Sequence, residues 1–176
     1  VSGMFNLQLA GNHTVSVEDA NNCRIDSIVN LSEPLPISID TESAADASCN
    51  GVADGVASIS VSGGNAPYTY TLNPDAVSNA SGVFNSLPIG DYTISVDDIN
   101  FCGPVSSGTL TVDEPLAIIL DSLATTPILC AGESTAEIHI YTSGGTGAFQ
   151  YSIDDGANYS ATSDFTSLAP GTYHIS

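Results

Sequence analysis

Two pairs of adjacent carboxylates stand at equivalent places in the chain, and an asparagine follows each pair. The two sets are Glu18-Asp19 with Asn21, and Asp97-Asp98 with Asn100. Carboxylate and amide oxygens are the ligands that Ca²⁺ prefers, and a calcium site needs about six to eight of them. The alternative is that Asp98 and Asn100 bond their own backbone and shape a turn. Because the chain has no EF-hand or glycine-aspartate nonapeptide signature, the sequence favours the turn and leaves Asp97, Asp98 and Asn100 as weak calcium candidates.

Groups that could move protons at neutral pH are scarce. The three histidines are far apart in the chain and show no metal-ligand spacing, and residues 35–115 contain no His, Lys or Arg. That segment therefore lacks a proton shuttle, a Ser/His or Cys/His pair, and a cationic group for an oxyanion. Asp97 and Asp98 are adjacent on a predicted strand end, where their side chains diverge and cannot act as a glycosidase pair. We expect no enzymatic activity, no catalytic residue and no bound cofactor.

The charge of the chain excludes two classes of partner. It has 20 acidic residues and one basic residue, Arg24, which gives a net charge of −19. A surface without lysine cannot neutralise phosphates, so we expect neither nucleic acid nor anionic membranes as partners. The longest apolar run, near residues 116–120, is much shorter than the roughly 20 residues that a membrane-spanning helix needs. Disorder is not expected either, since 42% of the residues are hydrophobic and alternate regularly.

A fixed period organises the sequence. One set recurs 81 positions later: Cys49, Gly63-Gly64, Phe84, Gly90 and Tyr92 return as Cys130, Gly144-Gly145, Phe165, Gly171 and Tyr173. A second set precedes its counterpart by 79 positions: Phe5, Gly11 and Cys23 stand before Phe84, Gly90 and Cys102. A tandem array whose length changes are confined to one loop has this pattern.

The period predicts three segments. Residues 1–34 are expected to hold the C-terminal part of a repeat, residues 35–115 a complete repeat, and residues 116–176 the N-terminal part of a third. The chain is therefore expected to be a fragment of a longer protein.

Alternating side chains predict an all-β fold. Ala57, Ile59 and Val61 alternate with serines, as in a half-buried strand. Tyr92 follows Gly90 at the start of a late strand, where a tyrosine corner would bond its hydroxyl to upstream backbone. About seven short strands per unit, with Gly, Pro and Asn turns, predict an immunoglobulin-like antiparallel β-sandwich in each repeat. We predict no helix.

The aromatic residues offer a further class of site. Tyr68 and Tyr70 could stack on a sugar, but they share the parity of Leu72, which favours core packing. Phe101 and Tyr159 lie in predicted loops and are the better, though weak, candidates for surface contacts. Isolated exposed aromatics are common and do not by themselves indicate a ligand.

The motifs between residues 49 and 102 resemble the SprB repeat family. The family pattern consists of Cys-x-Gly, a Ser-Gly-Gly turn, Pro-Tyr-x-Tyr, a Leu-x-x-Gly-x-Tyr corner and Asp-x-Asn-x-Cys. The corresponding elements are Cys49-Asn50-Gly51, Ser62-Gly63-Gly64, Pro67-Tyr68-Thr69-Tyr70, Leu87-Pro88-Ile89-Gly90-Asp91-Tyr92 and Asp98-Ile99-Asn100-Phe101-Cys102. The chain departs from the pattern before the last cysteine, where the family usually has Gly and this sequence has Asn22 or Phe101. Counting the partial copies, the resemblance covers the whole chain.

The resemblance implies a large cell-surface protein of gliding or related Bacteroidota that is exported by the type IX secretion system and takes part in adhesion. On that basis we expect an extracellular, non-enzymatic segment that acts as a stalk or as a multivalent adhesion module. Its partners would be the adjacent repeats of the same chain. The alternative is a carbohydrate-binding module, with or without calcium, for an extracellular polysaccharide or another surface ligand.

In an extracellular setting the four cysteines have three interpretations. A Cys49–Cys102 bond within one repeat would close a loop of about 54 residues and stabilise it by about 3–4 kcal/mol. Bonds between neighbouring repeats, Cys23–Cys49 and Cys102–Cys130, would stiffen the array. Free thiols are the third option. We favour the bond within the repeat, and we expect no catalytic cysteine because no base or electropositive setting accompanies any of them.

Overall fold

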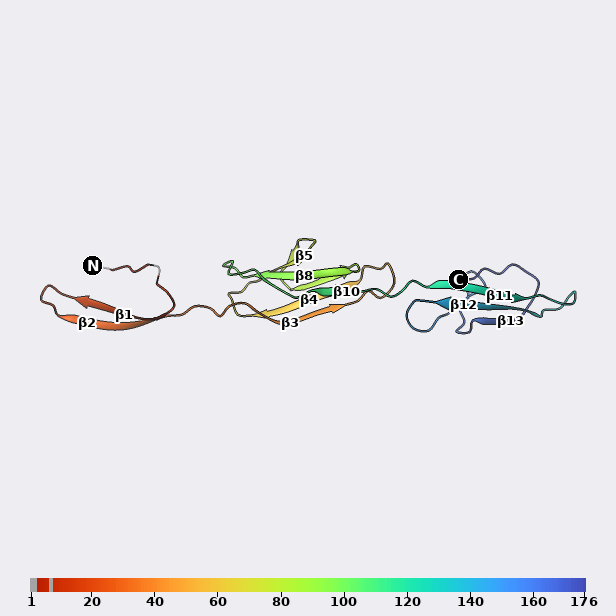
Figure 1. The fold of residues 1–176 in the computed structure, drawn as a ribbon, viewed down its shortest axis with the longest axis horizontal. Helices are drawn as coiled ribbons and strands as arrows, with labels where there is room; N and C mark the ends of the chain where they lie inside the picture. The colour runs from red at the N-terminus through yellow and green to blue at the C-terminus, as the bar shows by residue number, and fades with distance from the viewer. Residues whose placement is uncertain (1–2, 7) are drawn as a thin grey trace. The chain divides into compact units, whose positions relative to one another are not determined.

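The computed structural model describes residues 3–6 and 8–176, and every regular element in them is a β-strand (Figure 1). This confirms the predicted all-β fold. The strands are β1 (Gly11–Glu18), β2 (Arg24–Leu31), β3 (Ser38–Ala45), β4 (Gly55–Ser62), β5 (Thr69–Asn73), β6 (Val77–Asn79), β7 (Val83–Leu87), β8 (Gly90–Asp97), β9 (Val105–Ser106), β10 (Leu110–Val112), β11 (Ile119–Thr126), β12 (Ala136–Ser143) and β13 (Asp164–Leu168). In the described part of the chain, no helix is long and apolar enough to cross a membrane.

Contacts group the chain into two compact units. One consists of the segment that ends at Thr41 together with residues 59–82 and 94–107, and the other of residues 42–58, 83–93 and 108–176. The boundaries fall inside β3, β4 and β8, so these strands contribute to both units. This division differs from the predicted segments 1–34, 35–115 and 116–176, which stay predictions.

Two antiparallel sheets are formed within residues 35–115. One has the strand order β3-β4-β7 and the other the order β10-β8-β5-β6, with β9 also pairing with β8. Alternate side chains of these strands are buried and form the core: Ala57, Ile59, Tyr70, Leu72, Phe84, Leu87, Tyr92, Ile94, Val96, Leu110 and Val112. Two sheets that each bury one face in this way form a β-sandwich. Tyr70 is thus a core residue, whereas Tyr68 is half-buried and donates its hydroxyl to the carbonyl of Gly63.

The sheet β11-β12-β13 reproduces β3-β4-β7. Each of its strands begins and ends 81 positions after its counterpart, as β4 at 55–62 and β12 at 136–143 illustrate. Ile138 and Ile140 of β12 are buried, like Ala57 and Ile59 of β4. The repeated sequence therefore folds into a repeated sheet.

The hairpin β1-β2 reproduces the pairing of β8 with β10. Gly11 lies opposite Leu31 and His13 opposite Val29. In the same register, Gly90 lies opposite Val112 and Tyr92 opposite Leu110. The hairpin β1-β2 therefore has the same local structure as the strand pair β8-β10.

Candidate functional site

The acidic turn after β8 is closed by the side chain of Asp98, which is only 3% exposed. Its Oδ1 accepts the backbone N–H of Asn100 at 2.9 Å and that of Cys102 at 3.0 Å. Its Oδ2 accepts the N–H of Asn65 at 3.0 Å. The N–H of Cys102, followed by that of Asn65, lowers the pKa of Asp98 below its ordinary value of 3.8. The carboxylate is therefore held charged by backbone donors.

The turn after β1 has the same construction. Oδ1 of Asp19 accepts the N–H of Asn21 at 2.9 Å and that of Cys23 at 2.8 Å. These bonds, that of Cys23 first, lower the pKa of Asp19 as well. A bond pattern that recurs in two repeats explains why Asp and Asn recur there, since both side chains stabilise turns.

The oxygens of Asp98, the central calcium candidate, are engaged by backbone N–H groups. Both oxygens of Asp98 face N–H donors, Asp97 is half-buried and Asn100 is exposed. Within the described residues, no group of three or more His, Cys, Asp or Glu side chains is arranged to hold a metal ion. The geometry supports a turn-building role for Asp98.

We expect calcium to have little effect on the stability of the chain, because the oxygens of Asp98 are already occupied by N–H donors. Thermal unfolding followed by circular dichroism in 2 mM Ca²⁺ (about a thousandfold above a micromolar site) should give the same Tm as unfolding in chelator, within about 1 °C. A calcium-dependent rise of several degrees, lost in Asp98→Asn, would contradict this assignment.

The corner before β8 is tied by Tyr92. Its ring is buried, and its hydroxyl donates to the carbonyl of Pro88 at 3.0 Å, four residues upstream. Gly90 lies beneath the ring, where an added Cβ would be 3.5 Å from the phenolic oxygen. Tyr173 makes the corresponding bond to Ala169 at 2.9 Å. This is the bond that a tyrosine corner makes.

At the corresponding corner before β1 a different side chain makes the same bond. His13 Nε2 donates to the carbonyl of Leu9, also four residues upstream, at 2.7 Å. Imidazole and phenol thus serve the same corner, because each places an N–H or O–H donor at the end of a flat ring. His13 has a structural role here.

None of the four cysteines is paired in the structure, and all four are exposed. The predicted bonds Cys49–Cys102, Cys23–Cys49 and Cys102–Cys130 are not formed, and the assignment of Cys49 and Cys102 as a structural disulfide is wrong. Although Cys102 is exposed, partial desolvation of its thiol, followed by the charge of Asp98, raises the pKa of the thiol above its usual value of 9.0. The thiol is therefore a weak nucleophile at neutral pH.

Strand length explains this error. Cys49 lies two residues after Ala47, whose N–H donates to the carbonyl of Asp113. The neighbouring residue Val112 pairs with Gly90, the first residue of β8. Cys49 is therefore near the start of β8. Cys102 lies in the turn after Asp97, at the end of β8. Eight residues of strand span about 25 Å, whereas a disulfide needs its Cα atoms within about 7 Å.

The two predicted surface aromatics are both exposed, and they belong to different compact units. Phe101 is 84% exposed and Tyr159 is 57% exposed. Phe101 has φ of 56° and Asn22, its counterpart, has φ of 66°. Glycine adopts this left-handed conformation without a steric penalty, which explains the glycine that the family pattern places there.

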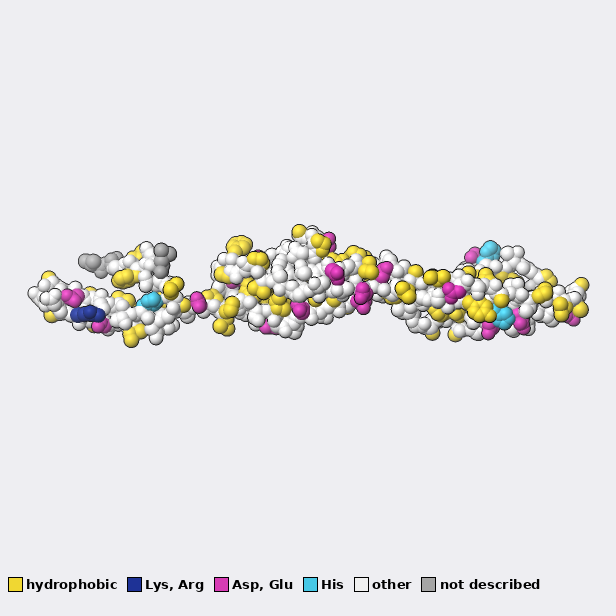
Figure 2. Space-filling model, in the orientation of Figure 1, with side chains coloured by type: hydrophobic (Ala, Val, Ile, Leu, Met, Phe, Trp, Pro, Cys, Tyr) yellow, Lys and Arg dark blue, Asp and Glu magenta, His cyan; other side chains and the backbone are white. Residues whose placement is uncertain are grey.

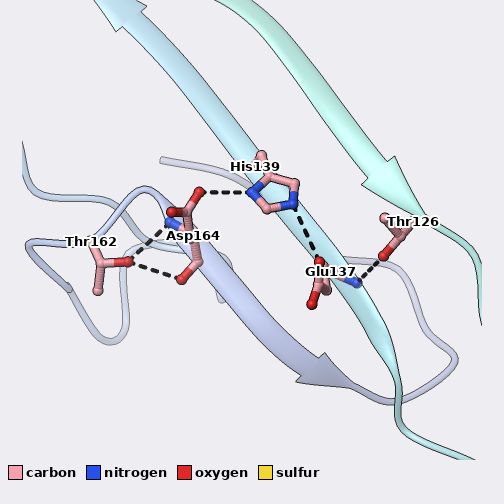
Figure 3. A network of polar contacts seen from close by, with 5 residues as sticks. All are labelled: Thr126, Glu137, His139, Thr162 and Asp164. Carbon is pink, nitrogen blue, oxygen red and sulfur yellow. Dashed lines mark hydrogen bonds and ion pairs between the residues drawn. The ribbon is translucent and has the colours of Figure 1, made fainter.

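A polar network in the sheet β11-β12-β13 was not predicted from the sequence (Figure 3). His139 on β12 lies opposite Asp164 on β13, and its Nδ1 donates to Asp164 Oδ1 at 2.7 Å. Its Nε2 is 3.4 Å from Oε2 of Glu137, two residues earlier on the same strand. Glu137 and His139 are two residues apart and so lie on the same face of the strand, which the sequence could have shown. The contact of His139 with Asp164 depends on strand register, which the sequence does not show. Ser58 and Val83 stand at the corresponding places of the complete repeat, so the network is not a shared feature of the repeats.

We expect His139 to titrate above the ordinary value of 6.5, because the bond to Asp164, more than that to Glu137, raises its pKa. The ion pair therefore contributes stability that is complete below pH ~6.5 and is lost as pH rises through the folded-state pKa. NMR titration of the imidazole should show the raised pKa, and Asp164→Asn should lower it more than Glu137→Gln does. Equal titration of His139 in wild type and Asp164→Asn would contradict the assignment.

Comparison with known proteins agrees with the periodic structure. Residues 41–77 and residues 122–158 each match the family model described as SprB repeat. The two matches begin 81 positions apart (122 − 41), which is also the offset between β4 and β12. A search of the curated proteins finds no match. Two segments of the chain are therefore similar to the SprB repeat.

Proposed function

We propose that this chain is a non-enzymatic repeat segment of a large cell-surface, adhesin-like protein, in which the repeats act as a stalk or as a multivalent adhesion module. The observation that carries the proposal is the reproduction of β3-β4-β7 by β11-β12-β13, in two parts of the chain that overlap the SprB repeat matches at residues 41–77 and 122–158. Export by the type IX secretion system and a role in gliding-related adhesion belong to the same proposal and rest on the family likeness.

The side chains shared by the repeats support a scaffold. Asp98 and Asp19 close equivalent turns, and Tyr92, Tyr173 and His13 tie equivalent corners. These bonds are all made within a repeat. What recurs therefore maintains the fold, while exposed positions such as Phe101 and Asn22 differ between repeats.

The surface charge supports repeats that do not associate with other copies of the chain. Figure 2 shows acidic side chains spread along the visible surface and a single basic patch, which belongs to Arg24, the one basic residue of the chain. A net charge of −19 makes copies of the chain repel one another at low ionic strength. Such a surface would suit repeats that are displayed side by side, where any adhesion comes from many weak contacts.

One observation favours the second candidate function, a carbohydrate-binding module. Phe101 is nearly fully exposed at the tip of its turn, and Ile99 beside it is 56% exposed. An exposed ring at a loop tip can stack on a sugar, and an aromatic at this position replaces the glycine of the family pattern.

Phe101→Gly is the variant that separates the candidate functions, because it removes the ring and also relieves the left-handed φ of 56°. We expect it to leave stability unchanged or to raise it by about 0–1 kcal/mol. A polysaccharide array should be screened with the soluble chain and with the chain clustered on beads. A stalk gives no signal in either format, and a multivalent adhesin gives a signal only when clustered.

Binding by the soluble chain that Phe101→Gly abolishes, with Tyr159→Ser as the matched control, would replace the proposal by a carbohydrate-binding module. Turnover of any arrayed substrate would contradict the non-enzymatic assignment.

A further inference from the structure

The same tripeptide stands at both predicted repeat boundaries. Glu33-Pro34-Leu35 precedes the complete repeat and Glu114-Pro115-Leu116 follows it. Proline has a fixed φ and no N–H, and such residues are common in loops and linkers. The bonds around Glu114-Pro115-Leu116, however, are unlike those of a flexible linker.

The Cys-Asn-Gly loop of the complete repeat holds the first two residues of this tripeptide. The side-chain amide of Asn50 donates to Glu114 Oε1 at 2.8 Å and to the carbonyl of Pro115 at 3.2 Å. The N–H of Gly51 donates to Glu114 Oε2 at 2.7 Å. Hydrogen bonds to a carboxylate are stronger than those between neutral groups. Glu114 and Pro115 are therefore tied to the repeat that they end.

The Gly-Gly turn of the next repeat holds the third residue. The carbonyl of Leu116 accepts the N–H of Gly145 at 2.8 Å. The complete repeat has the same bond at its own start, from the N–H of Gly64 to Leu35 at 2.6 Å. Leu116 is therefore tied to the repeat that it begins, and two junctions share this arrangement.

We propose that Glu114-Pro115-Leu116 is a stiff joint that restricts the swing between successive repeats. The carbonyl of Pro115 is bonded to Asn50 of the repeat before the joint. The carbonyl of Leu116 is bonded to Gly145 of the repeat after it. The peptide bond between them is planar, so φ and ψ of Leu116 are the only soft torsions between the two bonded groups. A Gly/Ser linker would leave two soft torsions at every one of its residues.

This inference rests on the proposed stalk function for its purpose, because a stalk of jointed repeats extends only if its joints are stiff. The Cys-Asn-Gly and Ser-Gly-Gly motifs then have a common role. Cys-Asn-Gly binds the last residues of its own repeat, and Ser-Gly-Gly binds the first residue of its own repeat. Every residue of Glu114-Pro115-Leu116 is therefore bonded to one repeat or the other.

Nuclear relaxation of the intact 176-residue chain tests the joint. In wild type, ¹⁵N relaxation should give one rotational correlation time for residues 55–112 and 119–168, and the heteronuclear NOE of Leu116 should match that of strand residues. Glu114→Ala should lower the NOE of Leu116 and separate the two correlation times. Glu33→Ala is the matched control, since the Glu33 side chain makes no such bond to a described residue, and it should change neither quantity.

An insertion variant keeps the test decisive if Glu114→Ala fails to fold. Gly-Ser-Gly-Ser placed between Pro115 and Leu116 leaves every bond of Asn50, Gly51 and Gly145 available but adds soft torsions, so the correlation times should separate. Separate correlation times already in wild type, or no change on insertion, would overturn the proposal. Either result is independent of the binding screen, so the joint and the proposed function can fail separately.

Discussion

Replacing Gly63 by alanine is expected to destabilise the chain by about 3 kcal/mol or more. An added Cβ would lie 2.0 Å from the carbonyl oxygen of Pro36, a backbone atom that cannot move aside as a flexible side chain could. In addition, Gly63 has φ of +74°, where a side chain is strained. Thermal unfolding should show a loss of about 10 °C or more for the cooperative unit that contains the substitution.

Gly51→Ala separates the two contributions to this loss. Gly51 has the same φ of +74°, but nothing lies within 4 Å of an added Cβ. Its substitution should therefore cost only the backbone term of about 1 kcal/mol. Equal losses in Gly51→Ala and Gly63→Ala would show that the close approach of Pro36 does not matter. Gly144→Ala should repeat the large effect, because its Cβ would lie 1.9 Å from the carbonyl oxygen of Ala117.

The second large effect is expected from Ile94→Ala in the centre of β8. Ile94 is 0% exposed, and truncating it removes buried apolar surface and leaves a cavity between the sheets. The expected loss is about 3–4 kcal/mol in the free energy of unfolding, measured by urea denaturation.

Ile99→Ala is the control for this prediction. Ile99 is 56% exposed in the turn just after the same strand, so truncating it should cost less than about 0.5 kcal/mol. Comparable losses in the two variants would mean that the core does not lie where the alternation of β8 places it.

The losses of stability expected from Gly63→Ala and Ile94→Ala are relevant to function, because both substitutions change structure that the repeats share. The Gly-Gly turn and the core of β8 belong to the fold, and Phe101 belongs to the surface. If the repeats are a stalk, stability variants should impair the protein and surface variants should not. A binding module should be impaired by the stability variants and also by surface variants, most of all at Phe101.

The departure from the family pattern at Phe101 has a conformational meaning. Phe101 and Asn22 both adopt positive φ, so the position accepts residues other than glycine at a modest cost. Asparagine tolerates this conformation better than phenylalanine does. The substitution therefore adds an exposed ring at some expense in backbone energy, and the binding screen tests whether that ring has a use.

The sequence by itself determined the repeat period, the all-β class and the core positions of strands such as β4 and β8. These depend on local regularities: alternation assigns a face to each residue, and recurrence at 81 positions identifies equivalent elements. The turn role of Asp98 and the corner role of Tyr92 were also predictable, because their partners lie within four residues, apart from the bond of Asp98 to Asn65.

The tertiary structure alone decided how residues distant in sequence are related. It separated Cys49 from Cys102 along the length of β8, because spacing in the sequence does not show which end of a strand a loop occupies. It brought His139 to Asp164 through the register of β12 and β13, and Asn50 to Glu114 across 64 positions. Strand register and loop placement follow from the packing of the whole repeat, so no local pattern could have predicted these pairs.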